Sequence, residues 1–336
     1  MILHDGTEPD GTRSRRRHRR PLLAVGAVVA VAVLWMLVLW SRVGAADGAP
    51  PGSGPGSGST LLLIGSDRRV AVPGVPIGRF GTATQVPGER ADVVIAVRSE
   101  SSQRTRALSI PRDMLATIPG GLAPERLTLL LQKGPTKVAD AICQSLGIGA
   151  DHLAVIRFDG LVAMIDEVGG VDIAPTTVVR DRGSGLLARA GRHRVDGATA
   201  LAYIRARHVE RWDGTAWIPD PEADQQRGDR ALEVLSSLGR RLDLGWATPF
   251  TNPSLAWTAT GAVTVDDDTG PFDTLAMVRT LRTLSNATRR SLPAVTIDGP
   301  TPMLTLRPGA AETVRWFTGG ATPAKACAVP TMLARR

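Results

Sequence analysis

The sequence predicts an α/β fold, namely an α/β/α sandwich with a central mixed sheet, preceded by one transmembrane helix. Residues 22–40 contain no charged side chain. From residue 60 onward, short apolar runs alternate with segments of helical spacing, which is typical of a sheet covered by helices. The 336-residue chain is 43% hydrophobic and 21% charged, and this composition excludes a disordered protein.

The amino-terminal segment combines a basic run with an apolar one. Residues 13–20 read Arg-Ser-Arg-Arg-Arg-His-Arg-Arg, and the 19 uncharged residues 22–40 follow. A helix of that length covers roughly 29 Å, about the hydrocarbon thickness of a bilayer. We therefore expect a basic cytoplasmic tail over 1–20 and a signal anchor over 22–40. The protein would then lie in the cell membrane as a single-pass protein, with its carboxyl-terminal domain extracytoplasmic.

Two other interpretations of this segment are a nucleic-acid-binding arm and a cleaved signal peptide. The basic run directly abuts an apolar span, which favours a flank of a membrane helix over nucleic-acid binding. The apolar region of a signal peptide has about 7–15 residues and ends at a small-x-small site. Here the span is longer and ends in bulky residues 37–40, although Val43-Gly44-Ala45 leaves the signal peptide open.

Residues 44–59 are rich in Gly, Pro and Ser, so they predict a flexible tether with a mean span of roughly 20–25 Å. One extracytoplasmic domain follows over 60–322, and 323–336 is expected to be a loose tail. The first elements of the domain are strands at 61–64, 91–97 and 106–110. Helical spacing over 136–146 stops at Gly147.

The second half of the domain continues the alternation. Residues 152–158 are strand-like, and 158–168 predict a helix that ends at Gly169-Gly170. Short strands or helices are expected at 171–173 and 200–204. Long helices are expected over 224–242 and from Pro271, a residue tolerated in a first turn.

The sequence excludes several familiar chemistries. It lacks a phosphate loop, a Gly-x-Ser-x-Gly elbow and a His-Glu-x-x-His motif. Two cysteines, Cys143 and Cys327, exclude a zinc site built on paired Cys-x-x-Cys. They form one disulfide in an oxidising compartment or, alternatively, Cys143 is a buried free thiol. The net charge of +8, carried almost entirely by arginine, indicates an anionic partner.

Asp and Arg residues recur together at the ends of predicted strands and on one helix. Ligands of open α/β sheets lie outside strand ends, so these charges are candidates for a site. Converging guanidinium groups fit a pyrophosphate, and carboxylates among them fit a bridging Mg²⁺. Ordinary surface salt bridges are the alternative. The five groups are Asp67-Arg68-Arg69, Arg90-Ala91-Asp92, Arg112-Asp113, Arg205-Ala206-Arg207, whose arginines point to the same side if the segment is extended, and Asp224 with Arg227 and Arg230.

These motifs resemble the LytR-CpsA-Psr (LCP) family of bacterial envelope proteins over roughly residues 60–320. The matching segments are 61–69, 90–92, 109–113, 168–173, 196–207 and 224–230. The resemblance implies a fold of the LCP type and a phosphotransferase that moves a phosphate-linked glycopolymer from a polyprenyl-pyrophosphate carrier to peptidoglycan in cell wall assembly. It implies that pyrophosphate is bound by Arg69, Arg90, Arg112, Arg205, Arg207, Arg227 and Arg230.

The resemblance also implies that Asp67 and Asp92 position Mg²⁺ or act as base, and that Arg112 is catalytic. The sequence departs from the family at Ala231, where Gln is usual, and at 127–129, where Asn is usual. A lost Gln removes one polar contact to phosphate. A non-catalytic scaffold that binds polyprenyl pyrophosphate, or a pyrophosphatase that uses water, is therefore an alternative function.

The polyprenyl tail needs an apolar cavity inside the sandwich. Leu161, Val162, Met164 and Ile165 either line it or form ordinary core, and core is the safer prediction. A nucleic-acid partner is not expected, because eight clustered basic residues without a helix-turn-helix pattern do not support specific DNA recognition.

Overall fold

The computed structural model divides the chain into two compact units, Met1–Arg42 and Val43–Arg336. It describes residues 14–54, 58–68, 88–101, 104–121, 123–223, 226–242, 247–297, 303–320 and 327.

The first unit contains helix α1, Ser14–Trp40, on which the expected membrane span over 22–40 falls. Among the residues that the structure describes, no helix combines the length and apolar character needed to cross a membrane. The structure therefore does not support the predicted span.

A central mixed sheet organises the second unit. In the described part of the chain it has seven strands in the order β1-β14-β7-β2-β3-β4-β15. Strand β2 lies in the middle, antiparallel to β3 and parallel to β7. The strands are β1 (Gly44–Ala46), β2 (Ser59–Ser66), β3 (Ala91–Ser101), β4 (Arg104–Ile110), β7 (His152–Arg157), β14 (Val263–Asp266) and β15 (Thr288–Ser291).

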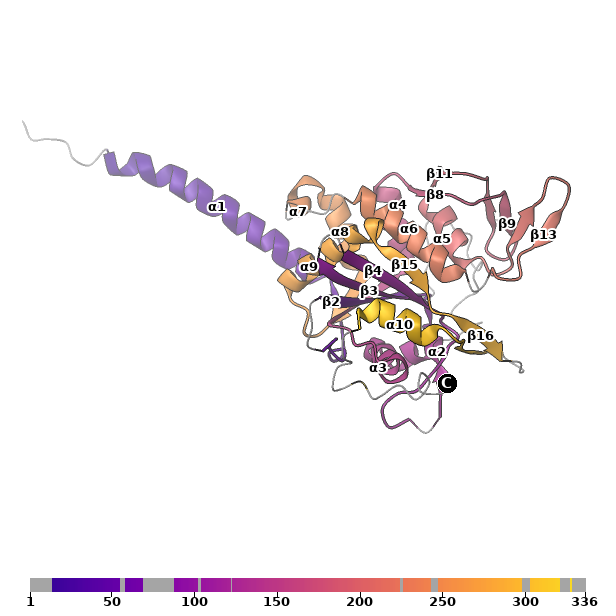
Figure 1. Cartoon of the computed structure of the whole chain (residues 1–336). Coiled ribbons are helices and arrows are strands. Elements are labelled where there is room, and N and C mark those ends of the chain that lie inside the picture. The colour runs from indigo at the N-terminus through magenta and orange to yellow at the C-terminus, as the bar shows by residue number, and fades with distance from the viewer. Residues whose placement is uncertain are drawn as a thin grey trace, which may run out of the picture. The chain divides into compact units, whose positions relative to one another are not determined.

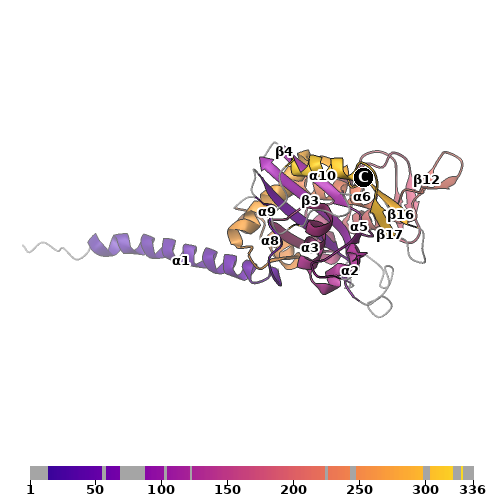
Figure 2. The same cartoon turned by 60° about the horizontal axis from the view of Figure 1, so that its bottom comes forward.

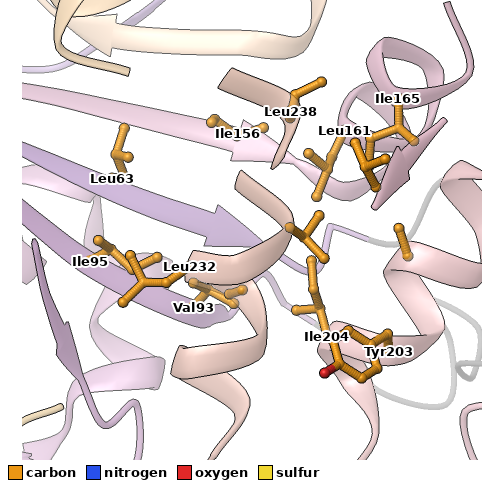
Figure 3. Packing of buried hydrophobic residues seen from close by; sticks show 14 of the residues in the cluster. Leu63, Val93, Ile95, Ile156, Leu161, Ile165, Tyr203, Ile204, Leu232 and Leu238 are labelled. Atoms are coloured by element: carbon orange, nitrogen blue, oxygen red, sulfur yellow. The ribbon is translucent and has the colours of Figure 1, made fainter. Parts of the chain in front are cut away.

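Both faces of the sheet are buried, which explains the continuous apolar run in β2. Leu61 and Leu63 point to one face and join one hydrophobic cluster, whereas Leu62 and Ile64 join a second cluster on the other face. A strand buried on both faces reads as unbroken apolar sequence because alternate side chains each meet a helix layer. Figure 3 shows part of the first cluster, where Leu63, Ile95 and Ile156 of the sheet face Leu232 and Leu238.

Helices cover the two faces, as Figures 1 and 2 show. The first cluster is closed by α4 (Phe158–Glu167), α5 (Gly197–Arg205), α6 (Arg227–Arg241), α8 (Pro253–Ala262) and α9 (Pro271–Thr283). The second is closed by α2 (Leu127–Leu130), α3 (Pro135–Leu146) and α10 (Ala310–Thr318). Helix, sheet and helix layers confirm the predicted α/β fold with a central mixed sheet.

Several helix boundaries follow from local sequence signals. Helix α3 begins with Pro135 and ends at Gly147, which adopts the left-handed conformation that favours glycine. The segment 200–204, left open as strand or helix, lies in α5, whose first turn Asp196 caps by accepting a hydrogen bond from the Thr199 amide at 2.8 Å. Helix α6 begins at Arg227, later than the predicted 224.

The smaller elements lie outside the central sheet. A second sheet has the order β10-β9-β12-β13. Its strands are β9 (Val179–Asp181), β10 (Leu186–Ala188), β12 (Glu210–Trp212) and β13 (Trp217–Pro219). Two-stranded pairs are β8 (Val171–Ile173) with β11 (His193–Val195), β16 (Ala294–Ile297) with β17 (Met303–Leu306), and β5 (Leu115–Ala116) with β6 (Glu125–Arg126). The short helices are η1 (Leu131–Lys133), α7 (Thr248–Thr251) and η2 (Leu284–Asn286).

The expected flexible tether over 44–59 is wrong for residues 44–54, because they are bound to the domain. Strand β1 pairs in parallel with β14 at the edge of the sheet. Asp151 then accepts hydrogen bonds from the Ser53 amide at 2.9 Å and the Ser53 hydroxyl at 2.7 Å. The composition predicted flexibility, but carboxylates distant in sequence satisfy the backbone donors of this segment. Residues 55–57 lie outside the described residues.

Cys143 and Cys327 form a disulfide, with their Cα atoms 4.8 Å apart. This settles the alternative left open by the sequence, since Cys143 is not a free thiol. The bond joins α3 to Cys327, which lies within the segment 323–336 that the sequence predicts as a loose tail. The rest of that tail lies outside the described residues.

Candidate functional site

Asp92 lies at an irregularity in the pairing of β2 with β3. Ser66 pairs with Ala91 and Gly65 pairs with Val93, so Asp92 is the extra residue of a β-bulge. A bulge of this kind redirects a side chain and is frequent beside functional sites. The Asp92 side chain is buried, with 3% of its surface exposed.

Arginine side chains from three different elements converge on the Asp92 carboxylate. Arg112, just after β4, donates from Nη1 to Asp92 Oδ1. The Nη2 atom of Arg205, at the end of α5, lies 3.9 Å from Oδ2, and Nη1 of Arg227, at the start of α6, lies 4.0 Å from Oδ1. Four of the sequence motifs, those of Asp92, Arg112, Arg205 and Arg227, therefore meet at one point.

The electrostatics of this cluster leave it strongly positive. Burial raises the pKa of Asp92, but Arg112, Arg227, Arg205 and Arg207 together lower it below its ordinary value. The carboxylate is thus ionised at neutral pH. In the described part of the chain, Asp92 and Asp113 are the carboxylates that contact these four guanidinium groups, which leaves a surplus of positive charge. A multiply charged anion fits that surplus.

A second carboxylate orients Arg112. Arg112 Nε lies 3.0 Å from Asp113 Oδ2, and Arg126 Nη1 lies 3.7 Å from Asp113 Oδ1. The Thr128 amide donates to the Arg112 carbonyl at 2.8 Å, which fixes the loop. The chain thus holds Arg112 from its backbone and from two carboxylates. Thr128, in the segment where the family usually has Asn, is part of this support.

The condition under which Arg205 and Arg207 would point to the same side, an extended segment, is not met. Arg205 is the last residue of α5, and Arg207 follows in the loop. The Arg205 guanidinium lies 5.2 Å from the centre of the Phe158 ring, a cation–π contact. Asp181 fixes the loop, because its Oδ2 accepts the Arg207 and His208 amides at 2.6 and 3.0 Å.

Arg230, three residues after Arg227 on α6, binds backbone carbonyl groups next to the arginine cluster. Its Nε donates to the Tyr203 carbonyl at 2.9 Å, and its Nη2 donates to the carbonyls of Ala206 and Ala223, the latter at 2.7 Å. Tyr203 in turn donates from its hydroxyl to Glu233 Oε2 at 2.9 Å. These bonds hold the end of α5, and with it Arg205, in place. A phosphate contact for Arg230 stays a prediction.

Asp67 and Arg90 are joined through the backbone beside Asp92. The Arg90 amide donates to Asp67 Oδ1 at 2.8 Å, and the Asp67 amide donates to the Arg90 carbonyl at 3.1 Å. Asp67 is buried. The Arg90 Nε atom is also buried and has no hydrogen-bond partner in the described part of the chain. The predicted site residue Arg69, like Asp224, lies outside the described residues.

An apolar cavity opens next to the charged cluster. It is shared by the strands β2, β3 and β7 and by helices α4, α5 and α6, and Gly65 and Phe158 lie on its wall beside the arginines. A Cβ on Gly65 would approach Phe158 Cε1 to 3.3 Å and Val93 Cβ to 3.0 Å. Glycine is therefore needed here for close approach. The remaining lining residues are Leu63, Ile64, Val93, Ile95, Ile156, Leu161, Ile204, Ala231 and Leu235.

The cavity changes the interpretation of two sequence observations. Of the four candidate lining residues on α4, Leu161 lines the cavity, whereas Val162, Met164 and Ile165 pack in the hydrophobic clusters. Ala231 is buried and lines the same cavity. A small apolar residue at 231 therefore extends the apolar wall.

The donor groups for a metal ion are few. Within the residues that the structure describes, no cluster of three or more His, Cys, Asp or Glu side chains is placed to hold a metal. Asp67 and Asp92 are both buried at adjacent ends of β2 and β3. Mg²⁺ is commonly bound through one or two carboxylates together with substrate phosphates and water, so these two residues fit that mode.

Sequence reasoning missed the residues that support the site. Phe158 under Arg205 and Asp181 beneath the Arg207 loop carry no motif. Asp181 is followed by Arg182-Gly183, a turn signal, and its Oδ1 accepts the Gly183 amide at 2.7 Å. That signal predicts a turn but cannot indicate that the second oxygen of Asp181 holds a loop 26 residues away.

Comparison with known proteins gives several relatives. Probable cell wall biosynthesis protein LcpB of Corynebacterium glutamicum is 31% identical over 207 residues, which are 59% of this chain and 50% of that protein. Cell wall biosynthesis protein LcpA of the same organism is 27% identical over 315 residues, 82% of this chain and 57% of that protein. The chain thus spans about half the length of these curated relatives.

Solved structures share the fold. The LytR-Csp2A-Psr enzyme from Actinomyces oris superposes with a TM-score of 0.65 at 26% identity, covering 82% of this chain and 96% of that chain. TagT bound to LIIa-WTA superposes with a TM-score of 0.55 at 18% identity, covering 79% and 90%. The family match extends over residues 53–267, which include Asp92 and every arginine that surrounds it. On this evidence the chain belongs to the LytR_cpsA_psr family.

Proposed function

We propose that the protein is a phosphotransferase that attaches a phosphate-linked glycopolymer from a polyprenyl-pyrophosphate carrier to peptidoglycan. The observation that carries this proposal is the juxtaposition of two environments. Four guanidinium groups surround Asp92, and an apolar cavity begins at Gly65 and Phe158 beside them. A pyrophosphate bearing a long apolar chain matches both environments at once.

The reaction needs positioning and charge neutralisation more than a protein nucleophile. A hydroxyl oxygen of the acceptor glycan attacks the phosphorus that carries the glycopolymer, and a new P–O bond forms. The bond from that phosphorus to the bridging oxygen of the pyrophosphate breaks, and polyprenyl phosphate leaves. Arg112, Arg205 and Arg227 stabilise the negative charge that develops on the phosphate oxygens.

The role of Asp92 follows from its surroundings. Arginines lower its pKa, and a carboxylate of low pKa is a weak base. Asp92 thus serves mainly to hold the guanidinium groups in position before the anion binds. The proton of the acceptor hydroxyl passes to a carboxylate only once bound pyrophosphate has offset the positive field, and Asp67 or Asp92 is within the site to take it.

We extend the proposal to a metal. Asp67 and Asp92 would hold Mg²⁺ together with substrate phosphate oxygens, and the ion would neutralise phosphate charge. The protein's own residues supply the rest: the guanidinium groups bind the anion, and the backbone pairing of Asp67 with Arg90 fixes the carboxylate.

The apolar cavity would take the carrier chain. Its free space is only about 20 Å³, so the helices that line it must separate from the sheet for an isoprenoid to enter. Ala231 supports this use, because Gln at that position would bring a polar group onto the wall. The departure from the family therefore favours lipid binding, which the phosphotransferase and the scaffold share.

The names of the relatives support a role in the cell envelope. LcpA and LcpB are described as cell wall biosynthesis proteins, and the TagT structure holds LIIa-WTA. We propose that the domain lies outside the cytoplasm, and the Cys143–Cys327 disulfide supports an oxidising compartment. Attachment to the cell membrane through residues 22–40, with the amino terminus cytoplasmic, stays a prediction from the sequence.

Cleavage of a lipid pyrophosphate tests the proposal. The purified full chain in detergent is incubated with geranylgeranyl pyrophosphate bearing a disaccharide, with Mg²⁺ or with chelator, and with soluble peptidoglycan fragments. We expect metal-dependent transfer that Arg112→Ala and Asp92→Ala abolish. Release of saccharide phosphate to water alone would indicate the pyrophosphatase, and binding without cleavage under every condition would contradict the proposal and leave the scaffold.

A further inference from the structure

The second sheet presents an outward face of unusual composition. Residues paired across an antiparallel sheet lie on the same face. Arg180 pairs with both Leu187 and Glu210, and Glu210 also pairs with Pro219. Two residues further along, Trp212 pairs with Trp217. We call this set the tryptophan face: Arg180, Leu187, Glu210, Trp212, Trp217 and Pro219.

On strands β9 and β10, the opposite face of the same sheet packs on the core. Val179, Leu186 and Ala188 alternate with Arg180 and Leu187 and are buried in the first hydrophobic cluster. On these two strands the tryptophan face therefore points away from the domain, and 68% of the Leu187 surface is exposed. On β12 and β13 the opposite face is exposed as well, at Arg211 and Ile218. Figures 1 and 2 show the strands of this sheet extending from the helical body. Trp212 and Trp217 are only half-buried there.

The polar and aromatic groups of this face are already fixed in one arrangement. Arg180 Nε donates to Glu210 Oε2 at 2.6 Å, and the Arg180 guanidinium lies 4.1 Å from the centre of a Trp217 ring. The ring centres of Trp212 and Trp217 are 5.4 Å apart with planes at 56°. Rigid aromatic side chains beside a fixed ion pair are ready to bind without a cost of ordering.

This chemistry matches a saccharide. One face of a pyranose ring presents C–H groups that stack on an aromatic ring, while its hydroxyl groups need donors and acceptors such as guanidinium and carboxylate. The ion pair leaves the face without local net charge, which suits a neutral sugar. A lipid bilayer fits less well, because Arg180 and Glu210 would have to leave water at the centre of the contact.

Strand β9, which carries Arg180, is bonded to the loop that follows Arg205 in the arginine cluster. Asp181, between Arg180 and the turn, accepts the amides of Arg207 and His208 from the loop that carries the site. Strand β12 then begins at Glu210, so few residues separate Arg207 from the tryptophans. The second sheet and the arginine cluster therefore meet at the loop 206–208.

We propose that the tryptophan face binds the sugar units of the donor glycopolymer that lie nearest to the pyrophosphate. The inference rests on the proposed function and deepens it, because it assigns a glycan subsite outside the arginine cluster. Trp212 and Trp217 supply the stacking surface, and Arg180 and Glu210 meet the hydroxyl groups.

Paired ligands test the proposal with the full chain in detergent. The dissociation constant is measured by calorimetry for geranylgeranyl pyrophosphate and for the same lipid bearing a chitobiosyl group. The wild type is expected to bind the saccharide-bearing lipid roughly tenfold more tightly, about the gain of one aromatic contact. Trp217→Ala should remove that gain and leave the affinity for the saccharide-free lipid unchanged, and Trp217→Tyr should retain most of it.

The matched control is Trp257→Ala, because Trp257 is a 43% exposed tryptophan on α8, away from this sheet. Equal binding of both lipids by the wild type, or an unchanged gain in Trp217→Ala, would overturn the inference. The inference would also be overturned if Trp217→Ala lost only its binding to soluble peptidoglycan fragments or only its binding to phospholipid vesicles. If the wild type does not bind the saccharide-free lipid, or if it binds that lipid no more tightly than Arg112→Ala does, the proposed function itself fails.

Discussion

Replacing Asp92 with Asn isolates what one charge does at the centre of the arginine cluster. The two side chains have nearly the same shape, so the change removes charge and leaves packing intact. At 3.9 and 4.0 Å, the ion pairs with Arg205 and Arg227 are each worth about 4 kcal/mol in gross Coulomb energy at an effective dielectric constant of about 20. Desolvation of the buried charges offsets much of this.

The stability lost in Asp92→Asn is therefore smaller than the gross Coulomb energy of these ion pairs. Removing one partner of a buried ion pair costs about 3–5 kcal/mol, because the other charge stays buried and uncompensated. Arg112 keeps Asp113 as a partner at 3.0 Å, so we expect the lower end, about 3 kcal/mol in the free energy of unfolding at pH 7. Urea unfolding followed by tryptophan fluorescence measures it.

The contribution of Asp92 to the free energy of unfolding depends on pH. Because the folded state lowers the pKa of Asp92, its contribution is present above the unfolded pKa of about 3.9 and is lost as pH falls through the folded value. The difference between wild type and Asp92→Asn should therefore shrink below about pH 4. Inorganic pyrophosphate should stabilise Asp92→Asn more than the wild type, since the anion replaces the missing charge.

The control for this prediction is Asp140→Asn, which breaks a partly exposed ion pair with Lys137 at 3.0 Å on α3. A surface pair of this kind is worth about 0.3–0.5 kcal/mol. If Asp92→Asn costs no more than Asp140→Asn, or if pyrophosphate stabilises the wild type and Asp92→Asn equally, then Asp92 does not hold the arginines together and the reasoning is wrong.

Three other changes separate the parts of the site. Gly65→Ala should weaken binding of geranylgeranyl pyrophosphate but not of inorganic pyrophosphate in calorimetry, because the new Cβ narrows the cavity at Phe158; equal effects would contradict this. Arg230→Gln should lower the free energy of unfolding by about 3 kcal/mol, because buried carbonyls lose their donor. Arg205→Gln should lower the free energy of unfolding less than Arg230→Gln, because Asp92 keeps Arg112 and Arg227 as partners, and it should mainly weaken pyrophosphate binding. The reverse pattern would exchange the roles of Arg205 and Arg230. Cys143→Ser should cost about 2–5 kcal/mol in chemical unfolding and make stability insensitive to reductant; a variant as stable as the oxidised wild type would show that the bond does not matter.

Strong periodicity made much of the fold predictable. The strand at 61–64 is predictable because its unbroken apolar run is buried on both faces of the sheet. The helix at 136–146 is predictable because its apolar residues repeat at helical spacing and form its buried face. The helices α8 and α10 were missed. Helix α8 is rich in Ala and Thr and has exposed Trp257, so it carries no clear apolar stripe. The interactions of segment 44–54 cannot be predicted from its composition, because its partners lie far along the chain.

The residue types of the site are predictable from the sequence, but the role of each arginine is not. Spacing along a helix places Arg227 and Arg230 near one face, and it cannot show that Arg227 reaches Asp92 while Arg230 is used on carbonyl oxygens. The meaning of Ala231 was equally hidden, because only the tertiary structure shows that it lines an apolar wall. Motifs identify charged residues, and packing decides which of them face the ligand.

Because Asp92 is the extra residue of a β-bulge, it can change in evolution without a change in the strand pairing that forms the fold. Ala91 and Val93 supply the ladder on either side, so Asp92 lies outside the pairing that builds the sheet. Mutation at this one position can alter charge at the site while the strand keeps its alternation of buried residues. Loss of the residue would straighten the strand and leave a regular sheet. A descendant of this chain could in this way lose its reaction in a single step and still fold.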